Sequence, residues 1–167
     1  MARRILAASS FVTNADLFIA DEPTTGLDAD AVEESLAMIK KLTTFEKTVI
    51  LITHDLKAAL KVSDRIAVFY GGTIVEVTKP FCFTDKSLLC HPYSKALFDA
   101  LPENVCETLP GINPFGNLIP KGCIFEPRCD YKGPECNIYK PIHKNQQHRQ
   151  FRCFYALLKG KVRWMFR

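Results

Sequence analysis

Two short runs of apolar residues in the first third of the chain have the pattern of strands buried in a parallel sheet. They cover residues 17–20 and 47–53, and almost all positions in them are apolar or β-branched, without the alternation typical of a half-exposed strand. Between them, apolar residues recur at helical spacing, namely Val32, Leu36, Ile39 and Leu42. This order predicts a right-handed strand–helix–strand crossover, in which both strands end at the same edge of the sheet.

The helix of this crossover is expected to begin at Asp28 or Asp30. Aspartate is a favoured N-cap residue because its carboxylate accepts a hydrogen bond from a free N–H group of the first turn. Glu33 and Glu34 follow in the first turns, where negative charge is favoured. The pattern therefore gives one helix with two possible starting points.

Farther along, the pattern changes to a hairpin and then becomes irregular. Residues 65–70 and 73–77 flank Gly71-Gly72, as in a two-residue hairpin turn. One further helix is expected at residues 93–100, before a linker rich in proline and glycine at residues 101–122. The periodic apolar pattern is weak beyond the hairpin, so a cross-link through cysteines would help this part to fold.

Three polar residues stand where the two expected strands end. Asp21 and Glu22 directly follow the first apolar run, and His54 follows the second. An aspartate in this place can hold Mg²⁺ against the oxygens of a transferring phosphoryl group. Glu22 points to the other side of the strand and can orient or deprotonate an attacking water, and a neutral His54 can contact a terminal phosphate. Such residues are often merely structural, but their shared edge favours the functional interpretation.

The segments ADEPTTGLDAD (residues 20–30) and ILITHDL (residues 50–56) resemble, in order and spacing, motifs of the ATP-binding subunits of ABC transporters. By this resemblance, Leu17 to Asp21 form the Walker B strand, Glu22 is the catalytic carboxylate and His54 is the switch histidine. The loop that ends at Asp28 would touch a second ATP-binding subunit in a head-to-tail dimer. Residues 1–8 look like the helix that follows the signature sequence of the family. The resemblance implies ATP and Mg²⁺ as ligands, with Asp21 near the metal.

Two more segments narrow the resemblance to one group of importers. HPYSKAL (residues 91–97) and GCIFEPRC (residues 122–129) are similar to the C-terminal extension of oligopeptide, dipeptide and nickel importers. In that group, cysteines of the extension can hold a four-iron four-sulfur cluster. The corresponding residues here, called the extension cysteines below, are Cys123, Cys129, Cys136 and Cys153. Together the resemblances extend from Met1 to about Cys153.

The cysteine pattern by itself leaves several possibilities open. The chain has 7 cysteines, an odd number, and structural disulfides are rare in a reducing cytosol. The extension cysteines are interrupted by prolines that favour loops, and four thiolates suit either zinc or an iron–sulfur cluster. Their spacing lacks the close pairs of zinc ribbons, and the family resemblance implies the cluster, while a set with nothing bound stays open. Cys82, Cys90 and Cys106 are expected to be ordinary thiols.

Several motifs of a complete ATP-binding domain do not occur in this sequence. A P-loop has the form G-x-x-x-x-G-K-[ST], whereas Gly160-Lys161 is followed by Val162 and lacks the earlier glycine. The signature motif and the glutamine loop are missing as well. We therefore expect a C-terminal fragment of a longer or split subunit, inactive as an ATPase alone and with an unpaired strand edge. An internal methionine taken as a start, a frameshift and a split gene are equally open.

The expected fold is α/β: a partial P-loop NTPase with a parallel sheet and flanking helices, followed by a small irregular cysteine-rich extension. Residues 1–78 would be the C-terminal half of the nucleotide-binding domain, residues 79–122 a linker with a helix, and residues 123–167 the cysteine-rich part with a basic tail. Charge agrees with this division, because residues 1–78 hold 8 Lys and Arg against 11 Asp and Glu, whereas residues 79–167 hold 14 against 7. The basic tail could meet an anionic membrane or nucleic acid, but a solvated terminus is favoured and no nucleic-acid partner is expected.

Composition agrees with an intracellular protein, since 47% of the residues are hydrophobic and 24% are charged, and no apolar stretch approaches the roughly 20 residues needed to span a bilayer. The resemblance implies a subunit that binds and hydrolyses ATP to drive import of peptides or nickel, peripheral at the cytoplasmic face of the membrane. Its partners would be a second ATP-binding subunit, integral permease subunits and, indirectly, a substrate-binding protein. Two alternatives stay open: a catalytically silent metal- or cluster-binding interaction module, and a soluble ABC-type ATPase outside transport.

Overall fold

The computed structural model describes residues 15–105, 109–114, 120–146, 149–158 and 161–162. The chain forms two compact units, Met1–Ser63 and Asp64–Arg167. Within the described residues, no helix is both long enough and apolar enough to pass through a membrane.

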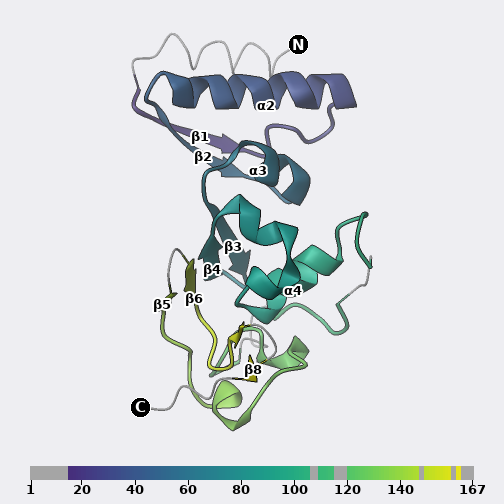
Figure 1. Ribbon diagram of the computed structural model, residues 1–167, viewed down its shortest axis with the longest axis vertical. Coiled ribbons are helices and arrows are strands. Elements are labelled where there is room, and N and C mark those ends of the chain that lie inside the picture. Colours follow the sequence, from purple (N-terminus) through teal and green to yellow (C-terminus); the bar gives the residue numbers. More distant parts are fainter. Residues whose placement is uncertain (1–14, 106–108, 115–119, 147–148, 159–160, 163–167) are drawn as a thin grey trace. The chain divides into compact units, whose positions relative to one another are not determined.

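The first unit contains the predicted strand–helix–strand crossover. Strand β1 (Leu17–Asp21) pairs in parallel with β2 (Thr48–Ile52), with Ile19 opposite Ile50. Helix α2 (Ala29–Thr44) connects them and runs alongside the two strands, and α3 (Leu56–Val62) follows β2 (Figure 1). The α/β character of this part is thus confirmed, although the parallel sheet of the described residues has only two strands.

Both described helices of this unit, α2 and α3, begin at an aspartate N-cap. The Asp28 carboxylate accepts a hydrogen bond from the backbone N–H of Ala31 at 2.9 Å, and Asp55 accepts one from Ala58 at 3.1 Å. Of the two predicted starting points of α2, the structure therefore selects Asp28. Helix α2 ends in a turn in which Glu46 has a φ of 58°. Its N–H donates to the carbonyl of Thr43 and the N–H of Lys47 to that of Leu42, so this left-handed residue closes the helix.

One face of the β1–β2 pair is open, contrary to the prediction that the strands are covered on both faces. Phe18, Ala20, Val49 and Leu51 are half-buried. The alternate side chains are 47–65% exposed, and they belong to Leu17, Ile19, Ile50 and Ile52. The continuous apolar run had indicated burial on both sides because it lacks alternation. Among the described residues of this unit, the buried apolar side chains, including Leu36 and Ala58, come from the helices.

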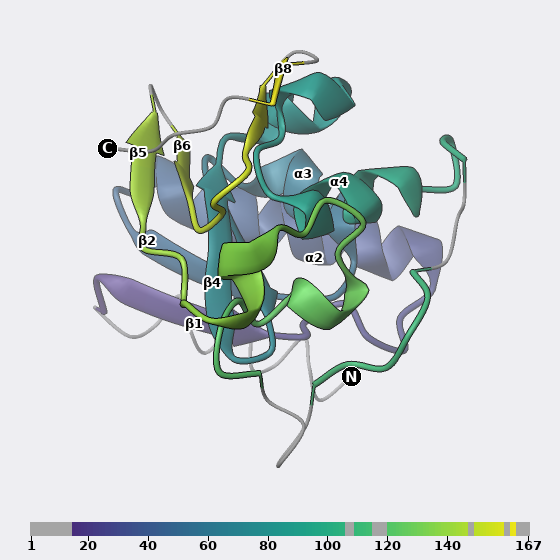
Figure 2. The same cartoon turned by 90° about the horizontal axis from the view of Figure 1, so that it is seen from below.

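The second unit is built on a four-stranded antiparallel sheet. Strands β3 (Ile66–Tyr70) and β4 (Thr73–Thr78) form the predicted hairpin across Gly71-Gly72, whose φ values of 54° and 76° suit a two-residue turn. Strand β6 (Arg149–Phe151) pairs with β4, and β5 (Lys144–Gln146) pairs with β6, giving the order β3-β4-β6-β5. Figure 2 shows β5 and β6 side by side, next to β4.

Short helical segments and loops complete this unit. The predicted helix at residues 93–100 is α4 (Pro92–Asp99), with His91 as its N-cap. The remaining elements are the 3₁₀ turns η1 (Pro80–Thr84), η2 (Lys86–Leu88), η4 (Glu126–Arg128) and η5 (Pro134–Asn137), and the two-residue strands β7 (Leu157–Leu158) and β8 (Lys161–Val162). The predicted small irregular cysteine-rich extension is not confirmed, and β6, which lies within it, joins β4 in one sheet. The predicted boundaries at residues 78 and 122 stay a prediction.

An aromatic cluster forms part of the core of the second unit. The ring of Phe125, which is 2% exposed, lies 5.0 Å from that of Tyr70 in an edge-on arrangement and 5.6 Å from the rings of His91 and Tyr93. Phe151 of β6 is fully buried as well. Edge-on and tilted contacts are the preferred geometry of aromatic pairs. Because Phe125 directly precedes η4, this cluster joins that segment to the hairpin and α4.

Candidate functional site

The structure brings Glu22 and His54 together at the ends of β1 and β2. Oε1 of Glu22 lies 2.8 Å from Nδ1 of His54 and accepts a hydrogen bond from the backbone N–H of His54 at 3.1 Å. Both side chains are accessible, with exposed fractions of 36% for Glu22 and 79% for His54. Their meeting follows from the parallel register, which places Asp21 opposite Ile52 and so puts the residues after each strand at one edge.

Glu22 is held in an unusual backbone conformation. Its φ is 47°, in the left-handed region that non-glycine residues seldom occupy. The conformation is fixed by hydrogen bonds on both sides of the residue: its N–H donates to the Ile52 carbonyl at 2.8 Å, and its own carbonyl accepts from Thr25 N–H at 3.3 Å. Strained residues of this kind cluster at functional sites, which makes the position of this carboxylate a notable feature of the unit.

A residue that the sequence reasoning missed also holds the Glu22 carboxylate. The hydroxyl of Thr25 donates to Oε2 of Glu22 at 2.9 Å. The two carboxylate oxygens therefore have different partners, since Oε1 faces His54 and Oε2 faces Thr25. The signal in the sequence is a threonine three residues after the glutamate in a turn, a spacing at which hydroxyls often bond to neighbouring groups.

The pair is electrostatically coupled although it is open to solvent. Hydrogen bonding to His54, followed by that to Thr25, lowers the pKa of Glu22 below its usual 4.5. Hydrogen bonding to Glu22 and the charge of that carboxylate raise the pKa of His54 above its usual 6.5. Both shifts favour the ionised forms, so each extends the pH range over which the two side chains form an ion pair.

Asp21 and Asp28 occupy different positions relative to this pair. Asp21 is the last residue of β1 and is exposed, next to Glu22 in the chain. Its carboxylate is available at the edge where Glu22 and His54 meet. The Asp28 carboxylate is used inside the chain, as the cap of α2. The predicted contact of the Gly26-Leu27-Asp28 loop with a second subunit stays a prediction.

The chemistry that these groups allow follows from their types and positions. A carboxylate with one oxygen held by a hydroxyl and the other by an imidazole can accept a proton from a water molecule placed between it and a substrate. A second carboxylate beside it, Asp21, offers the oxygen ligands that Mg²⁺ prefers. His54 can donate to an anionic oxygen once it leaves Glu22. The edge of β1 and β2 is therefore suited to hydrolysis of a metal-bound phosphate compound.

The extension cysteines lie close enough to influence one another. Burial above all, together with the neighbouring Cys123 and Cys136, raises the pKa of Cys129 to about 11. Burial also raises the pKa of Cys153, to which the other three cysteines add. Cys123, Cys136 and Cys153 are each 5–8% exposed. The folding pattern thus gathers the four thiols that the sequence singled out.

A close approach between two backbone segments helps to bring the extension cysteines together. The N–H of Cys123 donates to the carbonyl of Cys136 at 2.7 Å. A Cβ atom on Gly122 would overlap that same carbonyl oxygen, so only glycine fits beside it. The Gly122-Cys123 pair of the sequence motif is therefore explained by packing against η5.

The proximity of the four extension cysteines does not mean that they bind a metal. Among the residues that the structure describes, no group of three or more His, Cys, Asp or Glu side chains is arranged to hold a metal ion. The described residues as they stand therefore do not fit a cluster or a zinc ion.

The start of the HPYSKAL segment (residues 91–97) is held by a residue that the sequence reasoning also missed. Glu76 of β4 is fully buried, and its carboxylate accepts hydrogen bonds from the backbone N–H groups of Cys90 at 2.9 Å and His91 at 2.8 Å. Burial raises the pKa of Glu76. Its signal in the sequence is one acidic residue inside an otherwise apolar strand, because buried carboxylates are rare unless they are hydrogen-bonded.

Comparison with known proteins gives the same family as the motifs. Residues 85–136 match the family model of the oligopeptide/dipeptide transporter C-terminal region. The chain is 33% identical over 164 residues to the dipeptide transport ATP-binding protein DppD of Escherichia coli, a match that covers 94% of this chain and 50% of that protein.

Other relatives give similar values. The oligopeptide transport ATP-binding protein OppD of Salmonella typhimurium is 33% identical over 160 residues, covering 92% of this chain and 47% of that protein. The oligopeptide transport ATP-binding protein AppD of Bacillus subtilis is 33% identical over 162 residues, covering 92% and 48%. The chain thus spans about half the length of the curated relatives it matches, and the matched half is their C-terminal part.

Proposed function

The chain is a relative of the ATP-binding subunits of oligopeptide and dipeptide transporters, and from this premise we propose that it supplies the water-activating part of an ATP site that drives peptide import. The observation that carries the proposal is the hydrogen-bonded pair of Glu22 and His54, with Asp21 beside it, at the edge where β1 and β2 end. This edge is where parallel sheets bind their ligands.

Within this proposal each residue has one task. Glu22 orients a water molecule and accepts its proton as the oxygen attacks the terminal phosphorus of ATP. Asp21 would hold Mg²⁺, whose positive charge would offset that of the phosphate oxygens. His54 contacts the terminal phosphate and so exchanges its bond to Glu22 for a bond to the substrate. Asp28 and its loop contact a second ATP-binding subunit.

The partners and the cargo follow from the relatives and are part of the proposal. We assign the chain to the cytoplasmic face of a membrane, bound to permease subunits that form the path for the cargo. Peptides are the favoured cargo because the similar proteins are named for dipeptide and oligopeptide transport. Nickel is the second cargo class that the sequence resemblance implies.

The proposal is tested by measuring ATP turnover of the chain alone and together with a supplied N-terminal half of a relative. We expect turnover only in the combined sample, because the sequence contains no P-loop to hold the phosphates. Glu22→Gln should lower it by roughly 100- to 10,000-fold, the usual contribution of a general base. Glu46→Gln serves as the matched control, since Glu46 is also a left-handed, exposed glutamate but lies at the end of α2.

Two results would contradict the proposal. If size-exclusion chromatography shows that the halves associate and the combined sample is still silent, the chain is a non-catalytic module. If turnover appears and Glu22→Gln leaves it unchanged, another residue activates the water.

A further inference from the structure

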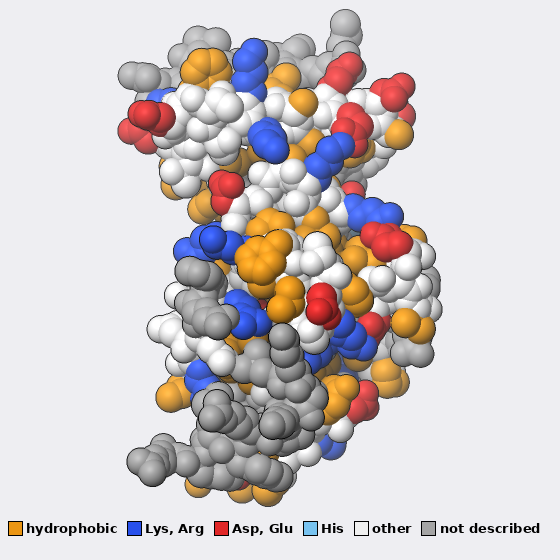
Figure 3. All heavy atoms as spheres, in the orientation of Figure 1, with side chains coloured by type: hydrophobic (Ala, Val, Ile, Leu, Met, Phe, Trp, Pro, Cys, Tyr) orange, Lys and Arg blue, Asp and Glu red, His pale blue; other side chains and the backbone are white. Residues whose placement is uncertain are grey.

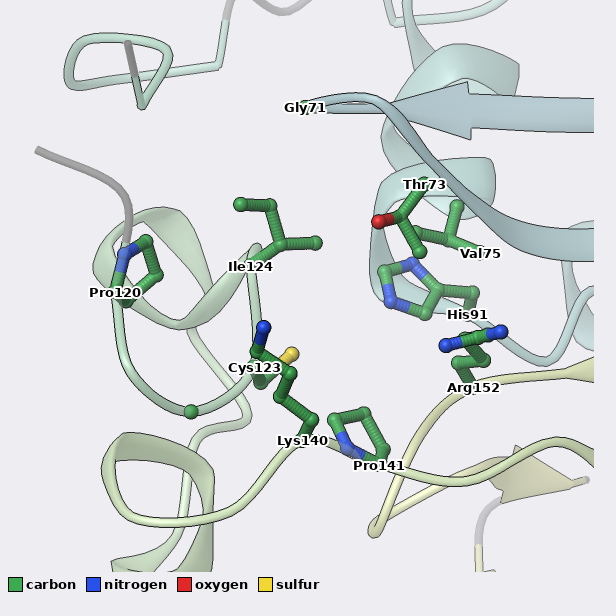
Figure 4. Close-up of a pocket in the computed structure, with 11 residues that line it drawn as sticks. Gly71, Thr73, Val75, His91, Pro120, Cys123, Ile124, Lys140, Pro141 and Arg152 are labelled. Carbon is green, nitrogen blue, oxygen red and sulfur yellow. The ribbon is translucent and has the colours of Figure 1, made fainter. Parts of the chain in front are cut away.

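A small pocket lies in the unit formed by residues 64–167, and the proposed ATP chemistry uses none of the residues that line it. Its volume is about 230 Å³, and its wall includes Thr73 of β4, His91 before α4, Lys140 and Arg152 (Figure 4). Of the extension cysteines only Cys123 reaches it, so the pocket is not a space enclosed by the four thiols.

Two cationic side chains face this pocket without an anionic partner. The backbone N–H of Arg152 donates to the carbonyl of Val75 at 2.8 Å, which fixes the residue beside β4. Nε of its guanidinium is buried and has no hydrogen-bond partner in the described part of the chain. Lys140 is exposed and makes no ion pair with any described residue. No aspartate or glutamate is among the described residues that line the pocket.

A buried histidine adds a neutral donor. His91 is 1% exposed, and its Nδ1 accepts a hydrogen bond from the N–H of Tyr93 at 3.1 Å. Burial lowers the pKa of His91 to about 3, so the ring is neutral and its single proton is on Nε2. This N–H has no hydrogen-bond partner among the described residues. In Figure 4 the ring is drawn between the Thr73 hydroxyl and the Arg152 guanidinium.

Leaving buried donors unpaired is costly, and in native proteins such groups are usually satisfied by a ligand or water. Here the buried, unpaired Nε of Arg152 lies at the same pocket as the Lys140 ammonium and the neutral His91 N–H. An anion with several acceptor oxygens satisfies them together, because guanidinium, ammonium and neutral N–H groups all donate to oxyanions.

The size of the pocket limits what can enter. A water molecule occupies about 30 Å³ in the liquid, and pockets for drug-sized ligands span about 300–1,000 Å³. The pocket of about 230 Å³ is therefore suited to a phosphate ion or a short carboxylate with a few waters. A nucleoside triphosphate is too large for it.

We propose that the pocket of Thr73, His91, Lys140 and Arg152 binds a small oxyanion of the phosphate or carboxylate class. Arg152 and Lys140 neutralise its charge, and the His91 N–H and the Thr73 hydroxyl donate to its remaining oxygens. The site is independent of the proposed ATP chemistry, and its failure would leave that proposal unaffected.

The test is equilibrium dialysis of the full chain against radiolabelled phosphate and, separately, radiolabelled acetate, with chloride holding the ionic strength constant. We expect one site per chain for at least one of the two ions. Arg152→Gln and Lys140→Gln should each weaken binding by about tenfold or more, as expected for loss of a charge-assisted hydrogen bond. Lys79→Gln is the control, because Lys79 is an exposed lysine of the same unit that does not line the pocket.

Each outcome of the dialysis experiment either supports the proposal or overturns it. Binding of phosphate alone, or of acetate alone, supports the proposal and identifies the class of ion. The absence of binding for both ions, or binding that survives both substitutions, overturns it. If Arg152→Gln does not fold by circular dichroism, Lys140→Gln carries the test, because an exposed lysine can be replaced without disturbing the core.

Discussion

At the scale of single residues, the two left-handed glutamates of the first unit have different explanations. Glu46 has a φ of 58° because it closes α2, where a left-handed residue is usual. Glu22 has a φ of 47° directly after a strand, where no helix end requires it. This conformation turns the Glu22 carboxylate toward His54 and Thr25.

This arrangement predicts the titration of His54. Its pKa is raised by Glu22, so the imidazole should remain protonated above pH 6.5, its ordinary midpoint. In Glu22→Gln the hydrogen bond and the charge are lost, and we expect the midpoint to fall toward 6.5. A titration of the histidine ring signals by NMR measures both values. Glu46→Gln should leave the His54 midpoint where it is, and an equal shift in both variants would contradict the assignment.

The sign of the pH dependence follows from the two shifts. The raised pKa of His54 means that its contribution to stability is fully present below pH 6.5 and is lost as the pH rises through the raised value. The lowered pKa of Glu22 means that its contribution is present above pH 4.5 and is lost as the pH falls through the lowered value. The ion pair therefore persists between the lowered value of Glu22 and the raised value of His54.

At the scale of elements, Asp28 has a defined structural task. Its carboxylate accepts the Ala31 N–H and satisfies one of the free donors at the start of α2. We expect Asp28→Ala to lower the free energy of unfolding by about 1 kcal/mol, the usual cost of losing an aspartate cap. Urea denaturation followed by circular dichroism measures this change.

Asp30→Ala is the matched control for the cap. Asp30 is an exposed aspartate in the first turn of the same helix, and the cap bond is made by Asp28. An equal loss in both variants would show that charge near the helix end, rather than the cap bond, stabilises α2.

Two buried thiols, the extension cysteine Cys129 and the separate Cys90, give a second prediction at this scale. Because burial raises the pKa of Cys129 to about 11 and that of Cys90 to about 12, both are protonated thiols at pH 8. In protein treated with a chelator, we expect alkylation by iodoacetamide at these residues to be slow at pH 8 and to rise about tenfold per pH unit, since only the thiolate reacts. Mass spectrometry of the labelled peptides measures the rates, with urea-unfolded protein as the fast reference.

Metal analysis of the untreated protein belongs to the same experiment. A bound cluster or zinc ion requires thiolates and would protect the extension cysteines together. Iron or zinc in amounts equal to the protein, lost in Cys153→Ser and retained in Cys82→Ser, would mean that the loops rearrange to ligate a metal. Without such a metal, the raised pKa values describe the resting state.

The sequence predicted the parts of this fold that depend on neighbouring residues. Helix α2, its cap at Asp28 and the hairpin at Gly71-Gly72 follow from local spacing. The meeting of Glu22 and His54 follows from one crossover rule. The roles assigned to Asp21, Glu22, Asp28 and His54 remain predictions.

What the sequence did not predict depends on distant residues. The pairing of β6 with β4 joins Gln150 to Val77, and no local pattern in the three residues of β6 indicates it. The burial of Glu76 depends on the N–H groups of Cys90 and His91, which the chain brings to it only after folding. The open face of β1 could not be predicted from the apolar run. Such a run shows that its residues favour burial, but it does not show which part of the protein covers them.

At the scale of the whole molecule, the exposed side chains of the β1–β2 pair indicate that this unit is built to pack against something else. The surface of the unit otherwise carries charged side chains of both signs (Figure 3). The chain covers about half of its relatives, so a segment present in them and not in this sequence is the natural cover.

This view predicts that the chain self-associates when it is alone. Ile19 and Ile50 are opposite each other in the register and are 65% and 47% exposed, and open apolar faces and strand edges drive association. Sedimentation velocity should show species heavier than the 18.9 kDa monomer, increasing with concentration. The double variant Ile19→Gln, Ile50→Gln should shift the distribution toward the monomer. Ile142→Gln, at a 74% exposed isoleucine outside this face, should not. A monomeric wild-type chain with a cooperative thermal transition would contradict the idea that the face requires a cover, since a unit of this size that is stable alone does not depend on a second half.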